Sequence, residues 1–248
     1  MTRIDIAHTI FGIIGNILGV ILFLSPVPTF VAICKKGSVE QYSVAPYLAT
    51  LMSCMVGVLY GLPLVHPHRL LVATIAASGC ILQTIYVTIF FIFSDRIKRL
   101  KVIMWLLFEL IFITILIIVT LIGVHNLKTR SEIVGTISVA LTIMMYASPL
   151  AIMKMVVKTK SVEYMPLFIS LASFGNSVAW TTYALISFDP FLTISNGAGT
   201  LLGVAQLILY AIYYNSTKQQ IVSREGNMEM NLSQVVVDNV CQETKPNK

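Results

Sequence analysis

The sequence predicts an all-α polytopic membrane protein, with seven transmembrane helices arranged as two parallel three-helix repeats joined by a linking helix (3+1+3). Its composition and an internal repeat predict this fold. Of the 248 residues, 56% are hydrophobic and 11% are charged, and the mean hydropathy is +0.84. A soluble domain carries roughly a quarter charged residues. The charges here lie between apolar stretches, whose lengths are near the ~20 residues that cross a bilayer core.

The internal repeat has a constant spacing. Ser38-Val39-Glu40 recurs as Ser161-Val162-Glu163, and each copy follows a Ser-Pro pair, Ser25-Pro26 or Ser148-Pro149, by thirteen residues. The same shift of 123 residues superposes Gly12 on Gly135, Lys35 on Lys158, Tyr60 on Tyr183, Pro67 on Pro190 and Gln83 on Gln206. A duplicated membrane unit is typical of transporters, because the interface between the copies forms a central path.

Seven apolar stretches give the expected transmembrane helices. They cover residues 8–33, 43–64, 70–93, 102–124, 132–156, 166–187 and 192–214. The first repeat is expected at 1–94, the linking helix within 95–131 and the second repeat at 132–215. Because each repeat has three helices, one linking helix is needed to insert both in the same direction. The polar segment 216–248 is expected to form a disordered tail.

The basic residues orient the chain. Thirteen of the seventeen Lys and Arg follow helices 1, 3, 5 and 7, and four (Arg3, Arg69, Lys128 and Arg130) lie on the other side. The positive-inside rule therefore predicts an external amino terminus and a cytosolic tail. The formal charge of +6 lies in loops, which favours contact with membrane lipid headgroups over a nucleic-acid partner.

Neither catalytic chemistry nor a metal site is indicated. The cysteines (Cys34, Cys54, Cys80 and Cys241) have no metal-binding spacing and form no disulfide framework, so no metal or cofactor is expected. The histidines (His8, His66, His68 and His125) all lie near predicted helix ends, so no enzyme is expected. A seven-helix receptor is a further class. Such receptors lack this repeat, and a retinal-binding one needs a lysine that residues 192–214 do not contain.

Four prolines occupy corresponding positions in the two repeats. Pro26 and Pro149 interrupt apolar helices, and Pro46 and Pro166 lie near the starts of the next ones. Proline removes a backbone donor and clashes with the preceding turn, which kinks a helix. Such kinks are common in membrane helices, but the paired placement favours hinges for alternating access.

Several motifs resemble the plant SWEET family of passive sugar facilitators, whose members have a 3+1+3 helix arrangement. SWEET transporters are a known example of parallel repeats. The resemblance covers roughly residues 7–215. It is carried by Gly12-Ile13-Ile14-Gly15-Asn16, Leu24-Ser25-Pro26-Val27-Pro28-Thr29-Phe30, Tyr60-Gly61-Leu62-Pro63, Met145-Tyr146-Ala147-Ser148-Pro149-Leu150, the segment 158–166 and Gln206-Leu207-Ile208-Leu209-Tyr210. The segments 24–30 and 104–109 further resemble its hexose-preferring branch.

The resemblance implies that Trp180 and Asn196 contact a sugar midway across the membrane. An indole face suits the C–H side of a pyranose, and a carboxamide both donates to and accepts from hydroxyls. Without the family, Trp180 reads equally as a packing aromatic, and Asn196 as a helix-start cap.

The first repeat departs from the family pattern. Where the family has Thr-Ile-Asn-Gly, this chain has Thr74-Ile75-Ala76-Ala77, so the expected asparagine position carries Ala76. The ungapped internal shift would instead pair Asn196 with Ala73, and it pairs Trp180 with Gly57. The pocket is therefore expected to be roomier and less polar on this side, with Gly57 and Ala76 as lining residues.

Three further residues have expected roles. Tyr60 and Asp189 match the family's outer gate, where a phenol and a carboxylate can hydrogen-bond, although Asp189 also reads as a loop residue capping the seventh helix. Glu109 lies in the linking helix. An acid inside a membrane helix is a functional candidate, but contact with the interface or a neighbouring helix is the favoured interpretation.

The expected function is a passive, bidirectional sugar facilitator (a uniporter), with a hexose such as glucose as substrate. The first alternative is a proton-coupled PQ-loop carrier of amino acids. None of the nine prolines is followed by glutamine, which disfavours it, and the seven-helix receptor is the second alternative. The resemblance implies self-association as a homo-oligomer and a location in the plasma membrane, with vacuolar and other endomembranes as alternatives.

Overall fold

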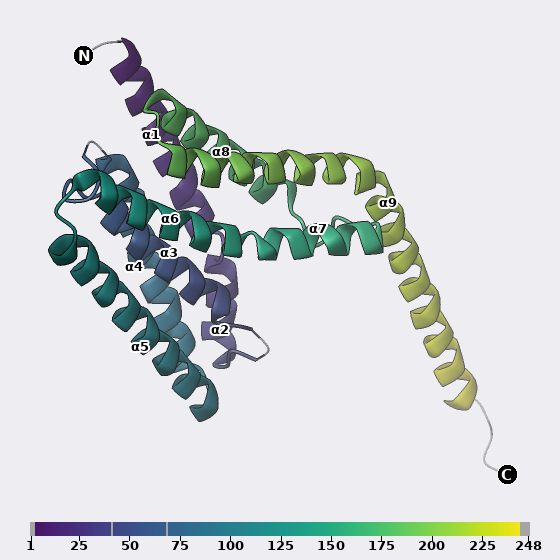
Figure 1. Ribbon diagram of the computed structural model, residues 1–248. Coiled ribbons are helices and arrows are strands. Elements are labelled where there is room, and N and C mark those ends of the chain that lie inside the picture. Colours follow the sequence, from purple (N-terminus) through teal and green to yellow (C-terminus); the bar gives the residue numbers. More distant parts are fainter. Residues whose placement is uncertain (1–2, 41, 68, 244–248) are drawn as a thin grey trace.

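The chain folds into a bundle of long helices, shown in Figure 1. The computed structural model describes residues 3–40, 42–67 and 69–243, except the side chains of residues 229 and 231–243. The elements are α1 (Arg3–Leu24), α2 (Val27–Lys36), α3 (Ala45–Gly61), α4 (Leu70–Ile92), α5 (Arg96–Ile118), the π-helical turn η1 (Val119–Gly123), α6 (Leu127–Met145), α7 (Ala147–Thr159), α8 (Leu167–Ile186) and α9 (Pro190–Glu243).

These elements form seven spans within the described residues, as predicted. The pairs α1–α2, α5–η1 and α6–α7 each make one span, and α3, α4, α8 and α9 make the others. Five spans are long and apolar enough to cross a membrane by length and composition alone; these are Arg3–Lys36, Leu70–Ile92, Arg96–Gly123, Leu127–Thr159 and Pro190–Met228. The shorter α3 and the Ser- and Thr-containing α8 complete the bundle.

The prolines lie where the helices break or begin. Ser25 and Pro26 lie between α1 and α2, and the Pro26 carbonyl oxygen accepts the Phe30 amide at 3.2 Å, so the chain resumes a helix at once. Pro149 lies in the first turn of α7, just after the break at Tyr146. Pro46 lies in the first turn of α3, and Pro166 is the N-cap residue of α8. Their role as hinges stays a prediction.

The two repeats meet through two contacts that the internal repeat relates to each other, because α1 corresponds to α6 and α3 corresponds to α8. The α1 helix packs on α8, and α3 packs on α6. The α1–α8 contact is close because α1 presents glycines to it. A Cβ atom at Gly15 would lie 2.7 Å from the Trp180 ring, and one at Gly12 would lie 3.0 Å from the Tyr183 ring. Side chains from both repeats therefore share one core.

The expected disordered tail is corrected for residues 216–243, which continue α9. This segment contains no proline and a single glycine, Gly226, so its sequence has few helix-breaking residues. Contacts with the α7–α8 connection also hold its first part: Thr217 Oγ1 accepts the Val162 amide at 2.8 Å, and Arg224 pairs with Glu163 at 2.8 Å. Beyond them α9 runs away from the bundle (Figure 1). Residues 244–248 lie outside the described residues.

Candidate functional site

A cavity of about 280 Å³ lies between the two repeats. Helices α1, α3 and α4 line it from the first repeat, and α6, α8 and α9 line it from the second. The structure brings all four predicted pocket residues, Gly57, Ala76, Trp180 and Asn196, to its wall. The four positions expected to contact a sugar therefore lie around one central cavity, and their roles in sugar binding stay a prediction.

Trp180 forms one wall of the central cavity and also packs in the core. Its side chain is buried, lies edge-on to Tyr183 with ring centroids 5.2 Å apart, and backs on Gly15 of α1. Trp180 is therefore both a packing aromatic and a residue of the cavity wall. The surrounding contacts hold the ring in place without a ligand, and such pre-organisation would lower the entropic cost of binding one.

Asn196 projects from the second turn of α9. The helix begins at Pro190, and Asn196 Nδ2 donates to the Leu192 carbonyl at 3.0 Å within it. The interpretation of Asn196 as a helix-start cap is therefore wrong. Asp189 caps the helix instead, because its Oδ1 accepts the amides of Phe191 and Leu192, each at 3.1 Å.

The family pattern, rather than the ungapped shift, identifies the position that corresponds to Asn196. Ala76 lines the central cavity, whereas Ala73 packs against Gly61 instead. A Cβ atom added to Gly61 would lie 2.8 Å from the Cβ atom of Ala73. Three more residues separate Gly57 from Ala76 than separate Trp180 from Asn196. A Cβ atom at Gly57 would lie 3.1 Å from Ala76 Cβ, so α3 and α4 approach closely there. Part of the space expected from the small side chains is therefore taken up by this approach.

Sequence reasoning missed several polar lining residues, among them Ser53 and Asn176. Asn176 precedes Trp180 by one helical turn, Ser53 precedes Gly57 by one turn, and the 123-residue shift superposes the two. The i, i+4 rule applied to the predicted pocket residues would have found both. Asn176 Oδ1 is buried and has no hydrogen-bond partner among the described residues. It thus offers an unused acceptor to a ligand hydroxyl.

Tyr60 and Asp189 join the two repeats at one end of the bundle. The Tyr60 hydroxyl lies 2.9 Å from both carboxylate oxygens of Asp189, which is only 1% exposed. Asp189 is therefore a helix cap, and the same carboxylate makes the contact with Tyr60 that was expected of a gate; the gate role itself stays a prediction. Because Tyr60 belongs to α3 and Asp189 precedes α9, this contact ties the repeats together at the end of the path.

Arg69 and His66, both in the connection between α3 and α4, were not predicted to join this gate. Arg69 Nε pairs with Asp189 Oδ2 at 3.2 Å, and its Nη2 donates to the Ser187 carbonyl at 3.3 Å. His66 Nε2 lies 3.7 Å from the same carboxylate oxygen, and its ring stacks on Tyr60. Arg69 was read only as a loop charge, because sequence spacing does not show that this connection meets the one between α8 and α9.

Two parallel repeats around a central cavity with a partly polar wall, joined to each other at one end, define a membrane transporter of the duplicated-unit class. Residues 9–98 and 132–218 match the family model described as "Sugar efflux transporter for intercellular exchange". The chain belongs to this family, the SWEET/MtN3 family, as its motifs predicted.

Named relatives cover nearly the whole chain. It is 50% identical over 240 residues to the bidirectional sugar transporter SWEET4 of Oryza sativa. This match covers 96% of this chain and 93% of that protein. It is 51% identical over 225 residues to SWEET7 of Arabidopsis thaliana, covering 90% and 87% of the two chains. A solved structure of a eukaryotic SWEET transporter superposes with a TM-score of 0.84 at 38% identity, covering 86% of this chain and all of that one.

Proposed function

We propose that this chain is a bidirectional sugar transporter that moves a hexose passively by alternating access. The observation that carries the proposal is the central cavity, in which Trp180 and Asn196 face a space between the repeats. Relatives that share about half of its residues are named bidirectional sugar transporters, which supports the same activity here.

The dimensions and polarity of the central cavity favour a single sugar ring. Its 280 Å³ lies near the lower end of the ~300–1,000 Å³ range of small-molecule pockets. Hydroxyl groups from α3 and α6 (Thr50, Ser53, Ser138 and Thr142) and carboxamides from α8 and α9 (Asn176 and Asn196) contribute to its lining. Such groups can exchange hydrogen bonds with several hydroxyls, while Trp180 supplies an aromatic face.

Passive transport fits the lining of the central cavity. Among the described residues, its wall includes no Asp, Glu, His, Lys or Arg. A proton-coupled carrier needs a titratable group that senses the substrate, and Glu109 lines a different cavity. The gradient of the sugar itself would then set the direction of net transport.

Alternating access would use the gate and the prolines. In this conformation Tyr60 and Asp189 join the repeats at one end. Separation of these residues would open that end, while bending near Pro26 and Pro149 would close the other. With the amino terminus outside, as the basic residues favour, the closed gate is the extracellular one. A plasma-membrane location and a homo-oligomeric assembly complete the proposal.

Counterflow of glucose in proteoliposomes tests this function. Vesicles loaded with unlabelled glucose should transiently accumulate labelled glucose, with the same initial rate whether or not a proton gradient is imposed. Empty vesicles and a Trp180→Ala, Asn196→Ala double variant are the controls. Counterflow that occurs only with the gradient would refute passive transport, and its complete absence would refute hexose as the substrate.

A further inference from the structure

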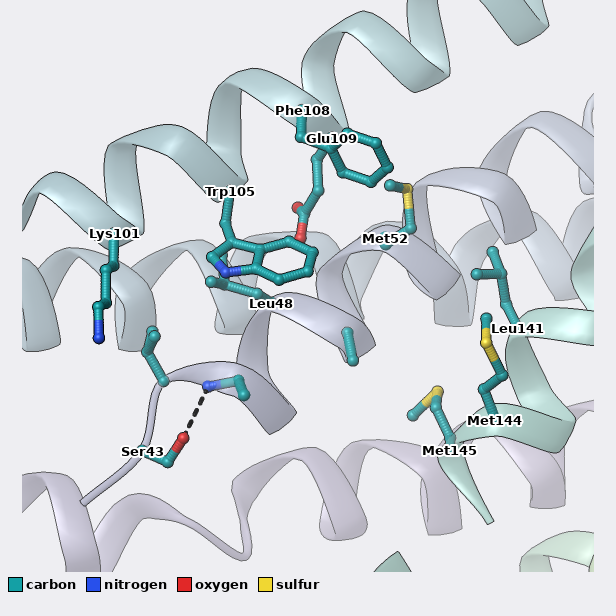
Figure 2. A pocket seen from close by; sticks show the side chains of 13 residues that line it. Ser43, Leu48, Met52, Lys101, Trp105, Phe108, Glu109, Leu141, Met144 and Met145 are labelled. Carbon is teal, nitrogen blue, oxygen red and sulfur yellow. Dashed lines mark hydrogen bonds between the residues drawn. The ribbon is translucent and has the colours of Figure 1, made fainter. Parts of the chain in front are cut away.

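A second, larger cavity of about 490 Å³ lies outside the central one, where the linking helix α5 meets α3 of the first repeat and α6 of the second. Figure 2 shows this lateral cavity from close by. Its wall is mainly apolar and includes Met52, Phe108, Leu141 and Met144. The lateral cavity thus lies on the α3–α6 side of the repeat interface. The α1–α8 side differs, because its glycines allow the two helices to pack closely.

One buried acid faces the lateral cavity. Glu109 is 3% exposed, and its Oε2 atom has no hydrogen-bond partner among the described residues. In Figure 2 its carboxyl group points from α5 into the space beside the Trp105 indole. An ionisable group surrounded by apolar side chains costs free energy unless a partner of opposite charge or a hydrogen bond compensates it. The expected contact with a neighbouring helix does not supply this partner.

Lys101 lines the same cavity but does not neutralise Glu109. The two residues are eight positions apart on α5, which separates their Cα atoms by about 12 Å along the helix axis. Trp105 lies midway between them, one turn from each. Within the described part of the chain no cation pairs with Glu109, so the inner part of the lateral cavity combines an unpaired carboxyl group with the rings of Trp105 and Phe108. This combination matches an organic ammonium ion, which a carboxylate attracts by charge and aromatic faces attract by cation–π interaction.

We propose that the lateral cavity is a second ligand site, which binds a membrane-soluble organic amine with its ammonium group on Glu109 and its apolar tail along Trp105, Phe108 and Met144. Charge complementarity selects the amine over an uncharged amphiphile. The walls suit entry from the lipid, because Trp105, Phe108 and Met144 are each more than half exposed at the surface of the chain.

The position of this site gives its ligand a way to affect the repeats. Met145 lines both the lateral and the central cavity, and it is the last residue of α6 before the break at Tyr146. An occupant between α3, α5 and α6 would brace this break against bending. Binding itself, however, does not depend on sugar transport, so the site can be tested separately from the proposed function.

The chain contains two tryptophans, Trp105 and Trp180, which makes a spectroscopic test direct. In a Trp180→Phe background, Trp105 alone reports the lateral cavity. We expect 8-bromooctan-1-amine, whose bromine atom quenches indole fluorescence, to quench Trp105 saturably in the purified protein. The matched alcohol, 8-bromooctan-1-ol, should require at least a tenfold higher concentration.

Two variants and one control complete the test. Glu109→Gln should raise the half-saturating amine concentration at least tenfold, whereas Glu132→Gln, which changes an exposed glutamate of α6, should leave it unchanged. Ala49→Phe keeps Glu109 but places a large side chain in the lateral cavity, so it should abolish saturable quenching. This variant still tests the site if Glu109→Gln does not fold. Quenching that is unsaturable, equal for amine and alcohol, or unaltered by either variant would overturn the proposal.

Discussion

Tyr60 and Asp189 are 129 residues apart in the sequence, yet the Tyr60 hydroxyl lies 2.9 Å from both carboxylate oxygens of Asp189. The same carboxylate caps α9 and pairs with Arg69. If the repeats part here, Asp189 would lose both Tyr60 and Arg69, which belong to the first repeat, but would keep the Phe191 and Leu192 amides of its own repeat. These two amides would still stabilise the carboxylate if this end opens. A reversible gate needs this property.

Removal of the Tyr60 hydroxyl should loosen the gate. A hydrogen bond to a charged group contributes roughly 1.5–3 kcal/mol, so Tyr60→Phe should raise the open fraction at least about tenfold. Cys54 lines the central cavity and can report this opening when the other cysteines are replaced by serine. Its labelling by an impermeant thiol reagent from the gate side should accelerate by that factor. Unchanged labelling would show that Tyr60 does not hold this end closed.

Trp180→Ala and Asn196→Ala should each lower hexose uptake strongly at equal amounts of folded protein. Because Trp180 also packs on Tyr183, its truncation removes core contacts worth about 3–5 kcal/mol in other proteins, so Trp180→Phe provides a gentler test. Ile194→Ala, on an exposed face of α9, is the matched control. Uptake that persists in all the pocket variants would place the sugar path elsewhere.

Asn176→Ala should weaken sugar binding, since it removes an acceptor that has no protein partner among the described residues. One lost hydrogen bond contributes about 0.5–1.5 kcal/mol, which corresponds to a two- to tenfold higher half-saturating hexose concentration. Initial uptake rates over a range of glucose concentrations measure it. Ser53→Ala should act in the same direction, and an unaltered half-saturating concentration in both would exclude this wall from the binding site.

Ala76→Asn should maintain or raise hexose transport. It restores the carboxamide of the family pattern, and Gly57 beside it has no side chain for the new group to displace. The measurement is uptake of glucose and of larger sugars, normalised to surface protein. A narrower substrate range with retained glucose uptake would indicate a filled pocket. Loss of all uptake would contradict the assignment of Ala76 to the pocket wall.

The carboxyl end should be cytosolic. Thirteen basic residues against four favour this orientation. A tag placed after Lys248 should then resist external protease in intact cells and become sensitive after permeabilisation. Glycosylation of Asn231, which begins an Asn-Leu-Ser sequon, would reverse the assigned topology.

The repeats and the seven spans could be predicted because they depend on local sequence, namely apolar length and a constant spacing. The position of the central cavity could also be predicted, since the motifs that contain Trp180 and Asn196 indicated it. The convergence of His66, Arg69 and Asp189 was not, because it depends on how two connections meet in space. The helix through residue 216 was missed for a related reason. Its partners, Val162 and Glu163, lie more than fifty residues earlier in the chain.

Duplication within a single chain has a geometric consequence at the central cavity. The 123-residue shift pairs Trp180 with Gly57, and Gly15, on which Trp180 rests, with Ser138. A symmetric dimer of the second repeat would have to fit two indoles into the space that now holds one, whereas a dimer of the first would have none. The chain therefore gains an asymmetric site, which would present different chemistry to the two faces of the proposed sugar. Neither repeat could build this site from copies of itself.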